Sequence, residues 1–388
     1  MMNVTSVKRI HQSDWTDSGV RFLRARDIVA AAKNEEPDDY LYISKEKYEE
    51  YSTLSGKVGV SDLLVTGVGT IGVPYLVRNL EPLYFKDGNI IWFQNSDKID
   101  GKFLFYSFSA EQIQGFINES AGIGTVGTYT IESGKKTPIS LPNQIEQAKV
   151  GEFFQQLDNL ITLHQRKFEK LTNVKKSMLE KMFPQNGSSY PEIRFKGFTD
   201  PWEQRKLGDI ADIVGGGTPS TGNQSYWDGD IDWYAPAEIA DQIYANSSQK
   251  KITGLGYENS SAKMLPPGTV LFTSRAGIGK TAILTRKGCT NQGFQSIVPH
   301  RGELDSYFIF SRTEELKRYG ELVGAGSTFV EVSGKQMAVM ELMMPPTMRE
   351  QQTIGGFFQQ LDHLITLHQR ELEKLQNIKK SMLEKMFV

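Results

Sequence analysis

The stretch FFQQLDNLITLHQRKFEKLTNVKKSMLEKMF fills residues 153–183, and the stretch FFQQLDHLITLHQRELEKLQNIKKSMLEKMF fills residues 357–387. The two copies start 204 residues apart. A period of that length is too long for the repeating unit of a solenoid, so it indicates two large modules that end in the same element. The copies differ at five positions, namely Asn159/His363, Lys167/Glu371, Phe168/Leu372, Thr172/Gln376 and Val174/Ile378.

The repeated element predicts a long helix. Neither copy contains proline, and both carry apolar side chains at helical spacing. Asn143 precedes Glu146 by three residues, and Thr347 precedes Glu350 by the same spacing, which is typical of a capping box at a helix start. From this cap to Phe183 the helix would run for about 40 residues, or roughly 60 Å at 1.5 Å per residue.

Two such helices in one chain predict mutual packing, because an amphipathic helix of this length does not stand alone in water. Near-identical copies favour an antiparallel coiled coil related by a pseudo-twofold axis. Gly151 and Gly355 are expected to bend the first turns. Two histidines in the heptad stripe either ligate a metal or, as we favour, set the register of the helices. The residues expected to pack along the stripe are Leu157, His164, Leu171, Met178, Leu361, His368, Leu375 and Met382.

The residues ahead of each helix predict a module of mixed α/β character. Short β-like runs lie at residues 63–66, 90–93, 270–273 and 296–298, with helical patterns at 104–117 and 305–319. The predicted fold class is therefore α+β, with two mixed modules and two long helices. The expected division is a module at 1–142, a helix at 143–183, a polar linker at 184–197, a module at 198–345 and a helix at 346–388.

The two modules are predicted to be diverged relatives. The run TGVGTIG at 66–72 aligns with TSRAGIG at 273–279, and SGK at 133–135 aligns with SGK at 333–335. The run 274–281 comes near a phosphate-binding P-loop, but Ser274 stands where that motif requires glycine, and a strand-like run follows it. We therefore expect a tight glycine turn between two strands, whose amides, with Arg275 and Lys280, can meet a phosphate or a base edge.

Composition and motifs favour a binding role over catalysis. The formal net charge of −2 argues against a non-specific polyanion binder, although local patches matter more than the sum. The single cysteine, Cys289, excludes a disulfide framework and is expected to be a buried apolar residue. Asp228, Asp230 and Asp232 lack the glutamate of a calcium loop. No complete catalytic constellation stands out, so we expect no metal and no cofactor. The absence of a long apolar run predicts a cytoplasmic protein without membrane contact.

Several polar segments are candidates for nucleic-acid contact. The run GGGTPST at 215–221 predicts a flexible loop with hydroxyl and amide donors. The run NQGFQ at 291–295 offers amides, which can read adenine, while arginine can read guanine. Arg21, Arg24 and Arg26 are expected to form a basic strand edge in the first module.

A long ordered series of motifs in the second half resembles the specificity subunit of type I restriction–modification systems. Each motif alone is weak, but the ordered series is specific, and the resemblance covers nearly the whole chain. The motifs are FKGF at 195–198, WEQRKLGDI at 202–210, GGTPS at 216–220, SR at 274–275, NQG at 291–293, SGK at 333–335 and PP at 345–346.

The resemblance implies a non-catalytic protein with two target-recognition domains, each of which reads half of a split site in double-stranded DNA. It implies that the long helices act as a spacer and dock two modification (methyltransferase) subunits, which restriction (translocase and endonuclease) subunits join. Methyl transfer and ATP hydrolysis would then belong to these partners. The residues expected to contact DNA are Trp227, Ser274, Arg275, Lys280, Asn291, Gln292 and Lys335 in the second module, and Arg24, Arg26, Thr66, Gly69 and Lys86 in the first.

The first module departs from the resemblance ahead of Trp15, which aligns with Trp227. It lacks a counterpart of the opening motif, so roughly twenty residues are expected to be missing there, either because the start is misplaced or because the gene is truncated, as in a silent cassette. A rival interpretation is a coiled-coil scaffold whose β-rich modules bind protein or other ligands. An ATPase that uses the 274–281 loop ranks third. DNA binding weakens steeply with salt and separates the first interpretation from the rival.

Overall fold

The computed structural model describes residues 2–95, 99–121, 127–185, 187–239, 242–275, 277–325 and 331–387. The chain divides into two compact units. Unit 1 contains Met1–Arg166 and Gln369–Val388, and unit 2 contains Lys167–His368. Each unit therefore includes part of both repeated helices, and each is described by itself.

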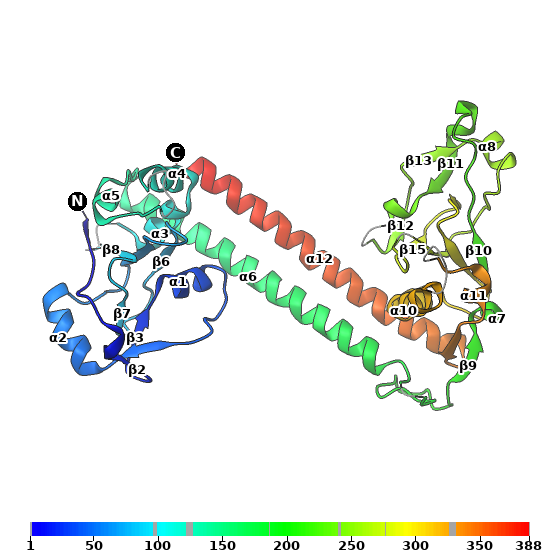
Figure 1. The fold of residues 1–388 in the computed structure, drawn as a ribbon, viewed down its shortest axis with the longest axis horizontal. Helices are drawn as coiled ribbons and strands as arrows, with labels where there is room; N and C mark the ends of the chain where they lie inside the picture. Colours follow the sequence, from blue (N-terminus) through cyan, green and yellow to red (C-terminus); the bar gives the residue numbers. More distant parts are fainter. Residues whose placement is uncertain are drawn as a thin grey trace. The chain divides into compact units, whose positions relative to one another are not determined.

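Two four-stranded sheets form the β part of unit 1 (Figure 1). The first has the order β1-β8-β5-β6 and is antiparallel throughout. The second has the order β2-β4-β3-β7, and its strands β3 and β7 run parallel. The strands are β1 (Asn3–Thr5), β2 (Trp15–Thr16), β3 (Val20–Leu23), β4 (Leu41–Ile43), β5 (Leu63–Thr66), β6 (Pro74–Leu76), β7 (Leu83–Phe85) and β8 (Ile90–Gln94).

The first sheet of unit 1 is covered on both faces, because successive side chains of a strand point to opposite sides. Leu63 and Val65 of β5 pack in one cluster with Phe108 and Ile117 of the covering helices. Leu64, between them, packs in a second cluster with residues of the other sheet. The shorter helices of this unit are α1 (Ala25–Ala32), α2 (Lys45–Ser55), α3 (Gly101–Ser109), α4 (Glu111–Ser120) and α5 (Ile131–Lys136).

Unit 2 repeats this plan with additions. Its main sheet has the order β10-β17-β14-β15-β12, its second sheet the order β13-β11-β16, and β18 pairs with β9. The strands are β9 (Glu203–Lys206), β10 (Ala211–Gly215), β11 (Trp227–Tyr234), β12 (Tyr244–Ala245), β13 (Lys250–Ile252), β14 (Val270–Phe272), β15 (Thr281–Leu284), β16 (Cys289–Thr290), β17 (Gln295–Pro299) and β18 (Glu341–Met344). The helices are α7 (Leu207–Ile210), α8 (Gly254–Glu258), α9 (Ser306–Ser311), α10 (Thr313–Gly324) and α11 (Gly334–Ala338).

The strands confirm that the modules are related. Antiparallel β8-β5-β6 corresponds to antiparallel β17-β14-β15, and the parallel pair β3-β7 corresponds to the parallel pair β11-β16. The β-like runs at 63–66, 90–93, 270–273 and 296–298 are confirmed as parts of β5, β8, β14 and β17, give or take an end residue. Each predicted short helix is broken in two, into α3 and α4 and into α9 and α10.

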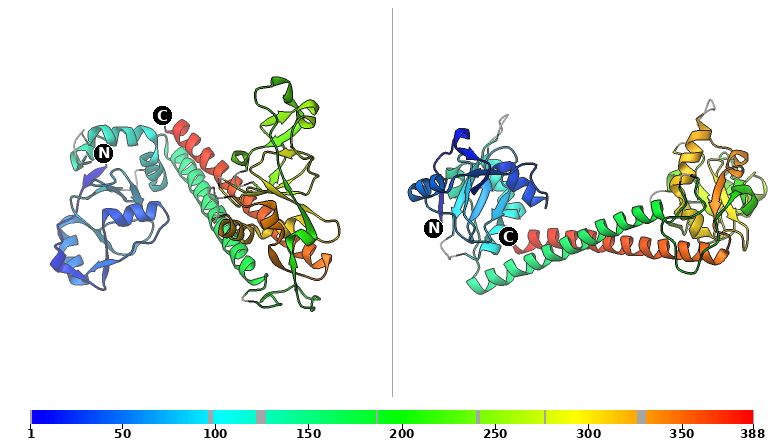
Figure 2. Two further views of the ribbon diagram at one scale, coloured as in Figure 1. Left: turned by 45° about the vertical axis from the view of Figure 1, so that its right-hand side comes forward. Right: turned by 90° about the horizontal axis from the view of Figure 1, so that it is seen from below.

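The two long helices begin where the capping boxes predict. Helix α6 spans Gln144–Lys181, and α12 spans Met348–Met386, each without interruption (Figure 2). The amide of Glu146 donates to Asn143 Oδ1 at 3.0 Å, and the amide of Glu350 donates to Thr347 Oγ1 at 3.3 Å. Both helix starts therefore have a side-chain acceptor for an otherwise unpaired amide.

The helix glycines lie within continuous helices, and the structure shows a packing role for them. Both helices continue through Gly151 and Gly355, whose role is close approach. A Cβ on Gly151 would lie 2.7 Å from Asp100 Oδ1, and one on Gly355 would lie 2.7 Å from Asp305 Oδ1. These aspartates cap α3 and α9 by accepting from the amides of Phe103 and Phe308, each at 2.9 Å. The absence of a side chain at these glycines thus lets the starts of α3 and α9 pack closely against the long helices.

Within each unit the long helices run antiparallel. In unit 1, Phe154 of α6 packs on Phe387, which follows α12, while Asp158 pairs with Lys379. In unit 2, Phe183 packs on Phe358, while Lys175 pairs with Asp362. Leu157, Leu375 and Met382 belong to the apolar cluster of unit 1, and Leu361, Leu171 and Met178 to that of unit 2. His164 and His368 are half-buried.

A tyrosine–aspartate–lysine contact is repeated at the same helix positions. In unit 1, Tyr106 Oη donates to Asp158 Oδ2 at 2.7 Å, and Lys379 Nζ lies 2.6 Å from Asp158 Oδ1. In unit 2, Tyr307 Oη donates to Asp362 Oδ2 at 2.9 Å, and Lys175 Nζ lies 2.6 Å from Asp362 Oδ1. Burial, together with the aspartate, raises the pKa of both tyrosines, so they remain donors. Each long helix therefore supplies the aspartate to one unit and the lysine to the other.

Candidate nucleic-acid interface

Two glycine loops with the same internal hydrogen bonds connect equivalent strands in the two units. In unit 1, Thr66 Oγ1 donates to the carbonyl of Thr70 at 2.5 Å and accepts from the amide of Val73 at 2.9 Å. In unit 2, Thr273 Oγ1 donates to the carbonyl of Gly277 at 2.7 Å and accepts from the amide of Lys280 at 2.9 Å. The predicted tight turn between two strands is confirmed in both modules.

A second loop lies beside each glycine loop. In unit 1 the amide of Gly67 donates to the carbonyl of Asn89, and in unit 2 the amide of Ser274 donates to the carbonyl of Gly293, both at 2.8 Å. We call residues 67–73 with 86–89 the paired loops of unit 1. The paired loops of unit 2 are residues 274–280 with 291–294, of which Ala276 lies outside the described residues.

Candidate residues of the two modules occupy equivalent places at the start of the second loop. The amide of Lys86 donates to the carbonyl of Leu23 at 2.8 Å, and the amide of Asn291 donates to the carbonyl of Tyr234 at 3.0 Å. Both contacts continue a parallel strand pair, β3-β7 in one unit and β11-β16 in the other. Lys86 and Asn291 therefore stand at the same carboxyl end of the second sheet.

The structure brings three candidate segments of unit 2 together. Thr218 Oγ1 donates to Gln292 Oε1 at 2.5 Å, which joins the loop after β10 to the paired loops. A Cβ on Gly293 would lie 3.0 Å from Asn291 Oδ1 and 3.5 Å from Arg275 Nε, so these side chains are close together. This arrangement places amide acceptors and donors beside a guanidinium, which is the chemistry that base edges and phosphates require.

The glycines after β10 do not form the flexible loop that the sequence predicts. A Cβ on Gly216 would lie 2.0 Å from the carbonyl oxygen of Asn291, and one on Gly217 would lie 2.3 Å from Ser261 Oγ. The carbonyl of Gly217 also accepts from the indole nitrogen of Trp233 at 2.8 Å. The segment is thus held tightly, and glycine serves close packing instead of flexibility.

The predicted contact residues of unit 2 differ in exposure. Lys280 of the glycine loop, Gln292 and Lys335 of α11 are exposed, and Arg275 and Asn291 are half-buried. Ser274 is fully buried, so its side chain is not presented to a ligand in this structure, and its contact with DNA stays a prediction. Trp227 is half-buried, and its indole nitrogen donates to the carbonyl of Ser220 at 3.1 Å, so it holds the loop after β10.

Two of the three arginines of the basic strand edge predicted in unit 1 pair with acidic side chains, while Arg21 lies over the ring of Tyr40. Arg24 forms hydrogen bonds with Asp27 and Asp39, and Arg26 also pairs with Asp39. Bonds from Arg24 hold the pKa of Asp39 below its ordinary value. In this structure the charge of Arg24 is therefore balanced within the module, and its contact with DNA stays a prediction. Sequence reasoning did not anticipate Asp39, fifteen residues further on.

The remaining residues of unit 1 that were predicted to contact DNA also differ in exposure. Thr66 is fully buried and its hydroxyl bonds within the loop, so its contact with DNA stays a prediction that the side chain as placed does not favour. Gly69 adopts φ +76°, and a Cβ there would have no atom within 4 Å, so the loop tip is open. Lys86 is half-buried in the second of the paired loops. Arg26, although paired, remains exposed.

A buried aspartate supports the second sheet of unit 2, and sequence reasoning treated it as part of an acidic cluster. Asp232 Oδ1 lies 2.6 Å from Lys251 Nζ, and its Oδ2 lies 2.6 Å from Arg286 Nε. Burial opposes ionisation of Asp232, but the bonds from Lys251, Ser248 and Arg286 prevail and lower its pKa to about 2. Asp232 thus fixes the positions of two partly exposed cationic side chains, Lys251 and Arg286, in unit 2.

Replacing Asp232 by asparagine is expected to lower the free energy of unfolding of unit 2 by about 2 kcal/mol near pH 7, because hydrogen bonds to a charged group are lost. The folded pKa lies below the ordinary value of about 3.9, so this contribution is complete above pH ~4 and declines as the pH falls toward 2. Urea unfolding at several pH values measures it. A gap between wild type and Asp232→Asn that stays constant from pH 5 to 2 contradicts the assignment.

The cysteine and the groups of metal-ligating residue types can be assessed in the part of the chain that the structure describes. Cys289 is buried, as expected, and burial raises the pKa of its thiol to about 11, which makes the thiol a poor nucleophile. Among the described residues, no three His, Cys, Asp or Glu side chains are grouped so that they could hold a metal ion. A search of the described helices found none with the length and apolarity that a membrane span requires.

Comparison with known proteins identifies the family of both halves. The family model for the type I restriction modification DNA specificity domain matches residues 22–173 and 199–377. The chain is similar to the type I restriction enzyme MjaIX specificity subunit of Methanocaldococcus jannaschii, with 34% identity over 190 residues, which is 48% of this chain and 44% of that protein. It is also similar to the putative MjaX specificity subunit of the same organism, with 25% identity over 74% of this chain and 68% of that protein.

A solved structure shares the fold. The crystal structure of a type I restriction–modification system S subunit from M. genitalium superposes with a TM-score of 0.60 at 13% identity, covering 100% of this chain and 94% of that one. The α+β class predicted from the sequence is confirmed by this likeness.

Proposed function

The chain belongs to the family of type I restriction modification DNA specificity proteins, and from this we propose that it is a DNA-binding specificity subunit that reads a bipartite, gapped site. The observation that carries the proposal is the match of the family model to both modules together with most of both repeated helices. We propose that 1–142 and 198–345 are its target-recognition domains and that it has no catalytic activity of its own.

The partners follow from the same proposal. The helices would set the spacing between the two half-sites and dock two modification subunits, which restriction subunits join. The paired loops support the DNA part of this proposal, because each module presents a glycine loop and a second loop at one end of its sheets. In unit 2 these loops gather Arg275, Asn291 and Gln292, which suit contact with phosphates and base edges.

Genomic methylation tests the proposal. We expect cells that express this chain together with a modification subunit of the same type to methylate both halves of one gapped motif. Single-molecule sequencing of their DNA would reveal the motif, and cells that lack this chain are the control. Unmethylated DNA in cells that contain both proteins would contradict the proposal. Affinity for the motif should also fall steeply with salt, whereas a protein-binding scaffold predicts no such slope.

Replacing Arg275 by alanine is expected to weaken binding to that motif by about 10–100-fold, equivalent to about 1–3 kcal/mol. Its guanidinium lies beside Asn291 and Gly293 in the paired loops of unit 2. Fluorescence anisotropy with a duplex carrying the motif measures the change. Arg301→Ala is the matched control, because Arg301 is exposed beyond the other end of β17. Equal losses from both variants would show that general charge, and not the paired loops, governs binding.

A further inference from the structure

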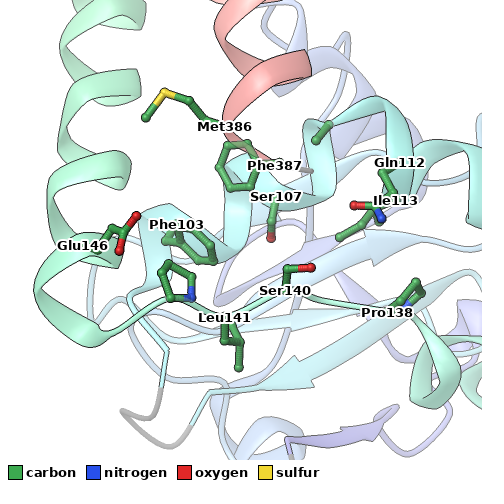
Figure 3. A pocket seen from close by; sticks show the side chains of 12 residues that line it. Phe103, Ser107, Gln112, Ile113, Pro138, Ser140, Leu141, Glu146, Met386 and Phe387 are labelled. Carbon is green, nitrogen blue, oxygen red and sulfur yellow. The ribbon is translucent and has the colours of Figure 1, made fainter.

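A cavity of about 250 Å³ opens in unit 1 between the starts of α3 and α6 and the end of α12. Phe103 of α3, Phe387 after α12 and Glu146 of α6 are among its lining residues, and Figure 3 shows the two rings and the carboxylate around it. Met386 and Leu141 also line it and are 41% and 52% exposed. Large apolar side chains with this exposure at a cavity mouth indicate a surface suited to a partner.

The equivalent place in unit 2 is filled by a segment of the chain. Trp202 is 2% exposed and lies with its ring centroid 6.0 Å from both Phe183 and Phe308. Its indole nitrogen donates to Glu350 Oε1 at 3.2 Å. Arg194 forms a two-pronged pair with the same carboxylate, at 2.7 and 2.9 Å. The strand β9 that follows Trp202 then pairs with β18.

The three partners of Trp202 have counterparts that line the cavity of unit 1. Phe387 and Glu146 hold the same repeat positions as Phe183 and Glu350, and Phe103 and Phe308 are both third after a capping aspartate. Phe103 and Phe387 are buried, at 2% and 8% exposed, as are Phe308 and Phe183, but two other pairs of equivalent positions differ sharply in exposure. Met182 is 3% exposed and its counterpart Met386 is 41% exposed, while Glu350 is 1% exposed and its counterpart Glu146 lies open to solvent.

We propose that this cavity is a docking site for a segment of another polypeptide that presents a tryptophan and an arginine as residues 190–206 do in unit 2. The indole would enter the cavity and pack against the rings of Phe103 and Phe387, whose centroids lie 5.2 Å apart, and the arginine would pair with Glu146. The Glu146 carboxylate accepts one long hydrogen bond, 3.5 Å from Asn143 Nδ2, so it can accept a bidentate arginine.

The cavity of unit 1 is expected to bind such a segment with moderate affinity. Pro138 aligns with Leu342 of β18 and has no amide hydrogen, so a docked strand would gain fewer ladder bonds than β9 gains. Ser107 lines the cavity where unit 2 has Arg312, whose guanidinium lies over the rings of Phe183 and Phe308. The smaller serine leaves more room for an incoming indole. The recognition would therefore rest on the tryptophan and the arginine.

A labelled synthetic peptide of residues 187–209 of this chain tests the proposal in fluorescence anisotropy with the full-length protein. We expect saturable binding with a Kd on the order of 10–100 µM, which suits a small interface. A Trp202→Ala peptide should bind at least about tenfold more weakly. Glu146→Arg in the protein should cause a similar loss, and an Arg194→Glu peptide should restore binding to that variant.

Glu152→Arg is the matched control, because Glu152 is exposed on the same helix. Glu146→Gln, which keeps a capping side chain, serves if the charge reversal unfolds the protein. If Glu146→Arg left peptide binding unchanged, the peptide would be replacing residues 187–209 in unit 2, and the proposal would be overturned. A peptide that does not bind at all would overturn it as well. Self-association of the chain that depends on Glu146, seen by sedimentation, would assign the cavity to a second copy and would also overturn it.

Discussion

Replacing Trp202 by alanine is expected to destabilise unit 2 by about 4 kcal/mol. Truncation of a buried aromatic side chain to alanine usually costs about 3–5 kcal/mol through lost burial and the cavity that remains. Trp202 is 2% exposed, packs against Phe183 and Phe308, and donates to Glu350. Its loss would also open the Arg194–Glu350 pair to water.

Hydrogen exchange followed by mass spectrometry measures this effect separately for each unit. Amides of β9, β18 and the adjoining part of α12 should lose protection, whereas unit 1 should exchange as in the wild type. Trp202→Phe is the control that keeps a ring and loses the indole hydrogen bond, so a cost of about 1–2 kcal/mol is expected. Comparable losses in Trp202→Ala and Trp202→Phe would show that the hydrogen bond, and not packing, matters most.

Replacing Asp362 by alanine is expected to cost unit 2 about 3 kcal/mol, because it leaves Lys175 and Tyr307 without their shared acceptor. The equivalent change of Asp158 should cost unit 1 less, about 1–2 kcal/mol. The difference follows from burial, since the Asp362 side chain is 9% exposed and that of Asp158 is 27% exposed. More exposed ion pairs contribute less.

The lysines give the sharper test of the reciprocal contact. Lys175 belongs to the same helix as Asp158, yet Lys175→Ala should loosen unit 2, where Asp362 lies. Lys379→Ala should loosen unit 1 in the same way. Unit-resolved hydrogen exchange distinguishes these outcomes, with Lys176→Ala, an exposed neighbour, as the control. If Lys175→Ala disturbed unit 1 alone, the reciprocal arrangement would be wrong.

The long helices could be predicted from the sequence because their signals are local. Capping boxes mark their starts at Asn143 and Thr347, and an uninterrupted apolar stripe extends to Lys181 and Met386. The role of Gly151 could not be predicted, because it depends on Asp100, which lies 51 residues earlier in the chain. A helix glycine has the same sequence signature whether it bends a helix or admits a neighbour.

The candidate site was predicted in part. The glycine turns and the cluster of Arg275, Asn291 and Gln292 follow from motifs that lie close in sequence. The burial of Ser274 and Thr66 could not be predicted, since a hydroxyl in a loop is equally suited to an outside partner and to the interior of its own module. The sequence shows that Glu146 and Glu350 hold equivalent positions. It does not show that they differ in burial, because the burial of Glu350 depends on Arg194 and Trp202.

The reciprocal tyrosine–aspartate–lysine contact has a consequence for how such genes can change. Tyr106 and Tyr307 do not hold the same position in their helices: counted from the capping residues Asp100 and Asp305, they differ by about one helical turn. The aspartate and the lysine of the contact, in contrast, hold the same positions in the two repeats. An imported module needs only an aromatic hydroxyl on the correct face of its helix to meet this contact. A charge reversal at Asp158, in contrast, is compensated only by one at Lys379, in the other repeat. Changes at the paired positions of one helix therefore require matching changes in the other helix, whereas whole modules can be exchanged independently.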